Sequence, residues 1–89
     1  MFNLYTLRFS NNKLYIGQTN NLQQRLVDHK NKAERSSKFS MENGEFELVY
    51  QEDYVTRIEV MRREKQLKGW TRAKKEALIT GNLELLKKL

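Results

Sequence analysis

The sequence has no cysteine and no proline, and only one of its 89 residues is a histidine. The lack of cysteine excludes disulfides and thiolate metal sites, and a single histidine excludes a metal site made of several imidazoles. Without cysteines the redox compartment cannot be inferred, and the cytoplasm is the default expectation. No linker or internal repeat divides the chain, so we expect one domain over residues 1–89.

Long apolar stretches are also missing. No run of about eighteen apolar residues occurs, and the first residues do not combine a basic segment with an apolar one. The sequence therefore predicts neither a membrane-spanning helix nor a secretory leader.

Positive charge, in contrast, is plentiful. Seventeen Lys and Arg against eleven Asp and Glu give a net charge of +6, and the pI is about 9.7. This balance favours a polyanionic partner. Nucleic acid is preferred over a membrane surface, because the basic residues are spread along the chain and form no single Lys/Arg tract.

Alternating apolar residues at the start of the chain predict a β-hairpin. The strands are expected over residues 2–9 and 13–16, with a turn at 10–12 and Gly17 ending the second strand. Thr19 or Asn20 can then cap a helix whose apolar positions are Leu22, Leu26 and Val27.

A polar, basic surface loop is expected over residues 31–45, followed by a third strand at 46–50. Thr56 then opens a second long helix, in which Ile58, Met61 and Leu67 are expected to face the core. Gly69 is expected to end that helix.

Thr71 is expected to cap a third helix that runs to about Ile79. Gly81-Asn82 separates this helix from a leucine-rich tail. The tail is expected to pack on the domain, or alternatively to form a dimer contact. The predicted fold class is α/β (α+β): a small three-stranded antiparallel sheet flanked by helices in the order ββαβαα.

Five residues of this framework could hydrolyse a phosphodiester. That reaction needs an activated water, neutralisation of charge on the phosphoryl oxygens and usually a metal ion. Tyr5 and Tyr15 lie on adjacent strands and can share a face. Arg25 and His29 are four apart on one helix face, and Glu64 offers oxygen ligands to Mg²⁺ or Mn²⁺.

Each residue also has an ordinary structural interpretation. Tyr5 and Tyr15 could be core residues with satisfied hydroxyls, and Arg25 could be a solvated helix residue. His29 could stabilise a helix end, and Glu64 could be an ion-paired surface carboxylate. Individually, none of the five indicates catalysis.

Together the residues resemble the GIY-YIG nuclease family, in particular its small stand-alone bacterial, UPF0213-like members. The resemblance covers nearly the whole chain. The segments that carry it are Asn3-Leu4-Tyr5, Tyr15-Ile16-Gly17, Asn20 to Leu26 with Arg25, His29, Leu48-Val49-Tyr50, Arg62 to Lys68 with Glu64, and Trp70 to Ile79.

The resemblance implies a metal-dependent DNA endonuclease. Glu64 would bind one divalent cation, Mg²⁺ or Mn²⁺, and Arg25 would stabilise the charge developing on the scissile phosphate. Tyr5 is the candidate general base, although a free phenol has a pKa near 10 and needs a neighbouring cation or metal-bound water. Tyr15 and His29 would orient the water or relay its proton, and the choice of base between Tyr5 and His29 stays open.

Further residues are expected to contact nucleic acid. Lys38, in a Lys-aromatic-Ser element that resembles the small members, is expected to bind the backbone, as are Lys13, Arg35 and Lys68.

Three aromatic residues bear on the substrate. Phe39, Tyr50 and Tyr54 could stack on unpaired bases, although Tyr50 is also a natural core residue. Stacking would favour single-stranded or branched DNA as the substrate. Little base specificity is expected, because the domain lacks the separate DNA-binding modules of homing and repair nucleases of the family. The expected state is a monomer or weak homodimer.

The sequence departs from the family in two places. Asn3 replaces the glycine of the first motif, a change that should not abolish activity. Several members use an asparagine on a late helix. The corresponding stretch here holds Lys74, Lys75 and Glu76, and Asn82 comes too late in the chain to match it.

Two other functions compete with the nuclease. A non-catalytic nucleic-acid-binding module would need the basic residues but would have no use for a metal-binding Glu64. A protein-interaction domain that uses the leucine tail would show no salt-dependent DNA affinity.

Overall fold

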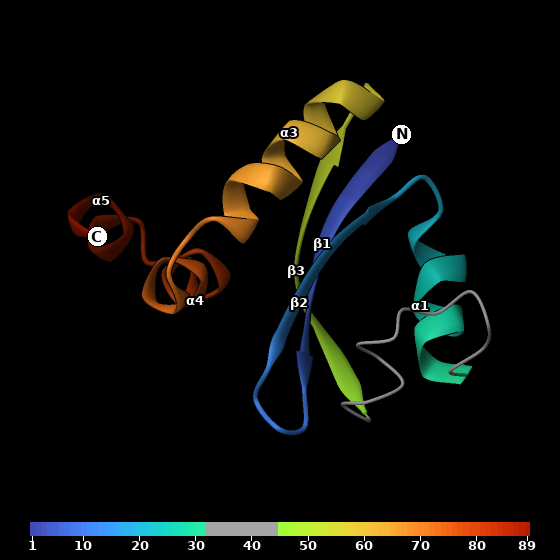
Figure 1. Cartoon of the computed structure of the whole chain (residues 1–89), viewed down its shortest axis with the longest axis horizontal. Coiled ribbons are helices and arrows are strands. Elements are labelled where there is room, and N and C mark those ends of the chain that lie inside the picture. The colour runs from blue at the N-terminus through green and yellow to red at the C-terminus, as the bar shows by residue number, and fades with distance from the viewer. Residues whose placement is uncertain (32–44) are drawn as a thin grey trace.

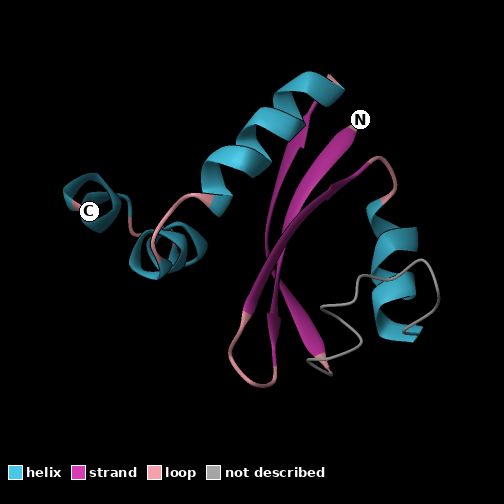
Figure 2. Ribbon diagram, in the orientation of Figure 1, coloured by secondary structure: helices cyan, strands magenta, loops and turns pink. Residues whose placement is uncertain are grey.

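Three antiparallel strands form the sheet around which the helices are arranged in the computed structural model (Figures 1 and 2), which describes residues 1–31 and 45–89. The strands are β1 (Phe2–Phe9), β2 (Leu14–Thr19) and β3 (Phe46–Tyr54), in the order β2-β1-β3. β1 is the central strand, and helices cover both of its faces. Residues 4–7 are therefore buried without interruption.

The predicted hairpin is confirmed, but β2 does not end at Gly17. The strand continues to Thr19, and Gly17 pairs with Tyr5 of β1. In the turn, Asn12 adopts a left-handed conformation with φ of 70°, which asparagine tolerates better than most residues.

The helix α1 (Leu22–Asn31) follows β2 directly. Its cap is Asn21 and not the predicted Thr19 or Asn20, since the Asn21 side chain accepts a hydrogen bond from the Gln24 N–H at 3.1 Å. A cap reaches the N–H group three residues further on, which places it immediately before the helix. Val27, counted among the apolar positions of this helix, is exposed.

The helix α3 (Arg57–Lys68) begins as predicted, with the Thr56 side chain accepting from the Glu59 N–H and Gly69 at the far end. The predicted buried face was partly wrong. Ile58 and Met61 are 63% and 50% exposed. Val60 lies with Leu67 against the sheet instead.

The chain ends in two helices, α4 (Arg72–Thr80) and α5 (Leu83–Lys88). Thr71 caps α4 as predicted, and Gly81 ends it in the left-handed conformation, with φ of 74°. The leucine-rich tail forms α5, which buries no residue and packs on α4. The expectation that this tail packs back on the domain was therefore wrong in part, because its leucines stay largely exposed.

Helices cover both faces of the sheet, and they are seen on opposite sides of it in Figure 1. Leu22 and Leu26 of α1 pack on the face that carries Tyr5, Leu7 and Phe9. The opposite face carries Leu4 and Ile16, which pack against the buried residues of α3 and against Leu78 of α4. The predicted fold class and the order ββαβαα are confirmed, with α5 added at the end.

The third strand is longer than predicted, since it runs to Tyr54 and not to Tyr50. No helix in the described parts of the chain is both long enough and apolar enough to cross a membrane.

Candidate active site

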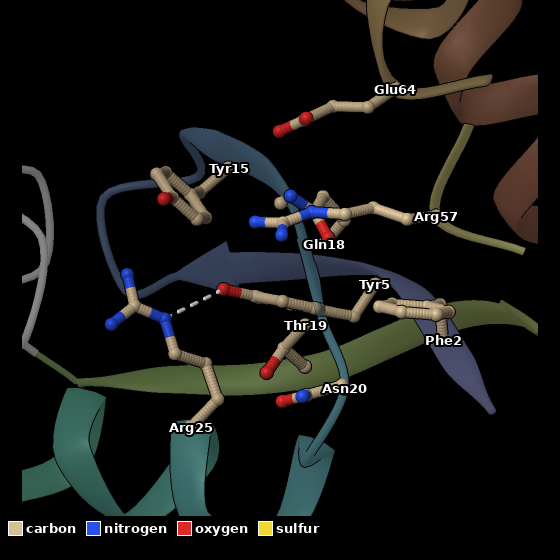
Figure 3. A pocket seen from close by; sticks show the side chains of 10 residues that line it. Phe2, Tyr5, Tyr15, Gln18, Thr19, Asn20, Arg25, Arg57 and Glu64 are labelled. Atoms are coloured by element: carbon tan, nitrogen blue, oxygen red, sulfur yellow. Dashed lines mark hydrogen bonds between the residues drawn. The ribbon is translucent and has the colours of Figure 1, made fainter. Parts of the chain in front are cut away.

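A cleft of about 410 Å³ lies between α1 and α3, beside β1 and β2 (Figure 3). Four of the residues predicted for catalysis line it: Tyr5, Tyr15, Arg25 and Glu64. The other lining residues are Phe2, Gly17, Gln18, Thr19, Asn20 and Arg57. Residues from two strands and two helices thus meet at one cavity. Glu64 lies far along the chain from Tyr5, Tyr15 and Arg25, and the fold brings it beside them.

The Tyr5 hydroxyl is the centre of the hydrogen bonding in this cleft. It lies 3.0 Å from Nε2 of His29 and accepts a hydrogen bond from Nε of Arg25 at 3.3 Å. Arg25 and His29 are one helical turn apart on α1, so both reach the same phenol. Tyr5 and His29 are completely buried. Tyr5 lines the cavity and His29 does not, so His29 lies behind the phenol.

The pairing of β1 with β2 explains the two tyrosines and the glycine. Tyr5 and Tyr15 project from the same face, with ring centroids 6.2 Å apart. Gly17 lies directly opposite Tyr5. A Cβ atom at Gly17 would come within 2.7 Å of the Tyr5 hydroxyl oxygen and 3.0 Å of the Tyr15 ring. Only glycine therefore leaves room for the phenol in this position.

Burial keeps the pair formed by Tyr5 and His29 uncharged. It raises the pKa of Tyr5 to about 12, although the Arg25 hydrogen bond acts in the opposite direction. Burial also lowers the pKa of His29 to about 4, and the positive charge of Arg25 lowers it further. At neutral pH the phenol is therefore protonated and the imidazole neutral, so Nε2 can accept the phenol proton.

Glu64 supplies the carboxylate of the cleft. It is on the face of α3 that also carries Val60 and Leu67, and its side chain is 21% exposed. Lys68, one turn later, forms an ion pair with it at 3.1 Å. In the described residues no three His, Cys, Asp or Glu side chains gather as a metal cage. A single carboxylate still fits Mg²⁺, which keeps several waters and takes further oxygens from substrate phosphates.

The residues predicted to bind nucleic acid are scattered. Lys68 is beside the cleft through its ion pair with Glu64. Lys13 lies outside the cleft, in a separate depression with Arg72 and Lys75. Arg35 and Lys38 lie outside the described residues.

Of the aromatic residues considered for base stacking, two have structural roles and Phe39 lies outside the described residues. Tyr50 and Tyr54 pack against the core beneath α3. Their hydroxyls donate to Glu52, which also binds Arg63 at 2.9 Å. Tyr50 thus matches the core interpretation.

Arg57 is the charged cleft residue that the sequence prediction missed. It is the first residue of α3, and its side chain points into the cavity (Figure 3). Arg57 and Glu64 are seven residues apart, or about two helical turns, so they share one face. That spacing could have identified Arg57, had the buried face of α3 been assigned correctly.

Both departures from the family pattern lie away from the cavity. Asn3 donates to Asp53 of β3 at 2.5 Å. Glu76 of α4 is bound by Arg8 and Arg72. Asn82 caps α5 through the Leu85 N–H.

Comparison with known proteins agrees with this geometry. Residues 1–77 match the family model of the GIY-YIG catalytic domain. The chain belongs to the GIY-YIG family. This domain family is a nuclease family, and the cleft gathers residues of its two name-giving motifs. The first triplet in this chain is Asn3-Leu4-Tyr5 and the second is Tyr15-Ile16-Gly17.

Among similar proteins, a UPF0213 protein of Bacillus pumilus is 37% identical over 84% of this chain and 74% of its own length. Another, from Natronomonas pharaonis, is 33% identical over 85% of this chain and 87% of its own. The solution NMR structure of a UPF0213 protein from Bacillus halodurans is also similar, with a TM-score of 0.59 and 28% sequence identity. The match covers the whole of this chain and 97% of the Bacillus halodurans chain. The predicted family and its UPF0213-like character are confirmed.

Proposed function

We propose that this GIY-YIG domain is a metal-dependent endonuclease that hydrolyses DNA phosphodiester bonds. The observation that carries the proposal is the cleft itself, where a phenol hydrogen-bonded to a neutral imidazole shares one cavity with Arg25 and Glu64. A binding module needs positive charge, but it does not need a proton acceptor and a carboxylate at the same point.

Arg25 stabilises negative charge. Its Nε is engaged by Tyr5, while a guanidinium has two further nitrogen atoms that can donate to phosphoryl oxygens. As negative charge grows on the phosphate in the transition state, these hydrogen bonds strengthen. Arg25 thereby lowers the barrier more than it strengthens ground-state binding.

Tyr5 and His29 activate the attacking water together. A phenol with a pKa of about 12 is not a base by itself at neutral pH. The Tyr5 oxygen can accept the proton of the water while its own proton passes to Nε2 of His29, 3.0 Å away. Tyr5 is buried in the free protein, so substrate binding must draw Arg25 toward the phosphate to open the hydroxyl. Tyr15 lies beside the phenol and helps to orient the water.

Glu64 is the residue that would hold one divalent cation, Mg²⁺ or Mn²⁺. When bound, such a cation neutralises charge on the phosphate and helps the leaving oxygen depart. Lys68 pairs with the carboxylate in the free protein, and its ammonium would move to a neighbouring backbone phosphate when Glu64 is engaged elsewhere.

The proposed substrate is single-stranded or structured DNA, cut with little base specificity. The charged groups of the cleft suit phosphate oxygens, and phosphate contacts carry no sequence information. The runner-up function is a non-catalytic nucleic-acid-binding module on the same scaffold.

Cleavage assays test the nuclease. Labelled single-stranded, duplex and branched DNA is incubated with Mg²⁺, Mn²⁺ or a chelator, using the original protein, Glu64→Ala and Arg25→Ala. We expect metal-dependent cleavage to fall by about 10²-fold or more in each variant, as when other transition-state contacts are removed. Glu84→Ala, an exposed change on α5, is the matched control and should cleave normally.

Two outcomes would count against this function. Unchanged cleavage in Glu64→Ala and Arg25→Ala would identify a contaminating nuclease. Salt-dependent DNA binding without cleavage in any metal would support the non-catalytic module instead.

A further inference from the structure

The second arginine of the cleft has no structural partner among the described residues. No ion pair or hydrogen bond joins Arg57 to any residue that the structure describes, and the side chain lines the cavity. Figure 3 shows it extending inward from α3, on the side of the cleft that also carries Glu64. An unpaired guanidinium facing a cavity is available to an anionic ligand.

The position of Arg57 opposes the stability of its own helix. Arg57 is the first residue of α3, and the amino-terminal end of a helix carries partial positive charge that repels a cation. Acidic residues are preferred there, and Glu59 of the same turn follows that preference. Places where a sequence breaks a local rule in this way are typically functional or strained sites.

The two arginines stand on opposite walls. Arg25 comes from α1 and Arg57 from α3, and both helices border the same cavity. Arg57 and Glu64 are separated by about 10.5 Å along the helix axis, at 1.5 Å per residue. A long arginine side chain can cover much of that distance, so its charge can lie near an anion bound beside Glu64.

We propose that Arg57 is a second phosphate-binding residue, which holds the DNA backbone against the α3 wall while Arg25 holds it against the α1 wall. The inference rests on the proposed function and refines it, because it makes the cleft a two-sided clamp for a phosphodiester strand. A guanidinium matches two phosphate oxygens at once and is suited to this role.

Other arginines of α3 show why the cleft location matters. Arg63 is bound to Glu52 and stacks over Trp70, so it has a structural role. Arg62 is exposed, has no partner in the described residues and does not line the cleft. Arg62 therefore matches Arg57 in charge, helix and exposure, and differs in location.

The experiment measures binding without cleavage. A fluorescently labelled single strand of about 15 nucleotides is titrated with the original protein, Arg57→Ala, Arg57→Lys and Arg62→Ala, in a chelator and at several salt concentrations. We expect Arg57→Ala to weaken binding about tenfold and to reduce the salt slope by about 0.7, the value for one lost phosphate contact on a single strand. Arg62→Ala should weaken binding less than about twofold, and Arg57→Lys should lie between them.

Thermal unfolding separates this role from a structural one. Because the cation opposes the helix dipole, Arg57→Ala should melt at the same temperature as the original protein or slightly higher. Equal loss of affinity in Arg57→Ala and Arg62→Ala, or no loss in either, would overturn the proposal. Since no metal and no cleavage enter the measurement, its result is independent of whether the nuclease assay succeeds.

Discussion

Gly17 is required in this cleft because it has no Cβ atom. It lies opposite Tyr5 in the hairpin, and the phenol occupies the space in which any other side chain would begin. The phenol cannot move away freely, because His29 and Arg25 hold its oxygen. The glycine of the second motif is therefore a steric requirement of the tyrosine in the first.

Gly17→Ala should displace the Tyr5 hydroxyl and impair cleavage more than folding. We expect a loss of about 1–3 kcal/mol in the free energy of unfolding, as in other overpacked sites, with cleavage reduced by about tenfold or more. Denaturant melts and initial cleavage rates measure the two effects.

Gly69→Ala is the matched control for that change. Gly69 has an ordinary helical φ of −82°, and a Cβ there would meet its nearest atom, a backbone oxygen, at 3.5 Å. Its cleavage rate should equal that of the original protein. Normal cleavage by Gly17→Ala would contradict the proposed role of the Tyr5 position.

The residues of the cleft were predictable from the sequence to different degrees. Tyr5, Tyr15, Arg25 and Glu64 stand in motifs with family spacing, so the sequence indicated them, and the structure brings them to one cavity. The sequence did not show that His29 is buried behind Tyr5, because burial depends on how α1 packs on the sheet. Their catalytic roles remain predictions until cleavage is measured.

At the scale of the elements, the composition of α3 explains why the sequence pattern predicted the wrong buried face for this helix. The sheet-facing stripe of α3 contains Arg57, Val60, Glu64 and Leu67, so half of its members are charged. The spacing of apolar residues identifies the buried face of a helix only where the whole of that face is buried. Here Arg57 and Glu64 line the cleft, so the apolar pattern is interrupted where polar groups are needed.

Replacing one residue from each face of α3 by alanine tests this orientation. Leu67→Ala removes a side chain that is 1% exposed, and it should cost about 2–5 kcal/mol of unfolding free energy. Met61→Ala removes a side chain that is half exposed and should cost less than about 1 kcal/mol. Urea denaturation of both variants measures the difference, and equal costs would mean that α3 is rotated relative to the sheet.

At the scale of the whole molecule, the net charge of +6 is spread over more than the cleft. Lys13 lies with Arg72 and Lys75 in a depression of about 200 Å³ near the hairpin turn. The cleft is lined by Tyr15 and mainly by the other end of β2, at Gly17 to Thr19. Gln18 comes five positions after Lys13, which is about 16.5 Å along a strand at 3.3 Å per residue.

This separation predicts that the contribution of Lys13 depends on the length of the bound strand. A strand of about 15 nucleotides can reach both places, whereas a dinucleotide, whose single phosphate is held in the cleft, cannot. Lys13→Ala should therefore weaken binding of the long strand by about two- to fivefold, reduce its salt slope by about 0.7 and leave the short strand unaffected. Arg57→Ala should weaken binding of both strands, because every bound strand passes through the cleft.

Fluorescence anisotropy with the long strand and NMR titration with the short strand provide the measurements. Equal weakening of both strands by Lys13→Ala would show that Lys13 acts through overall charge, and the backbone track from the cleft to the hairpin turn would then be wrong.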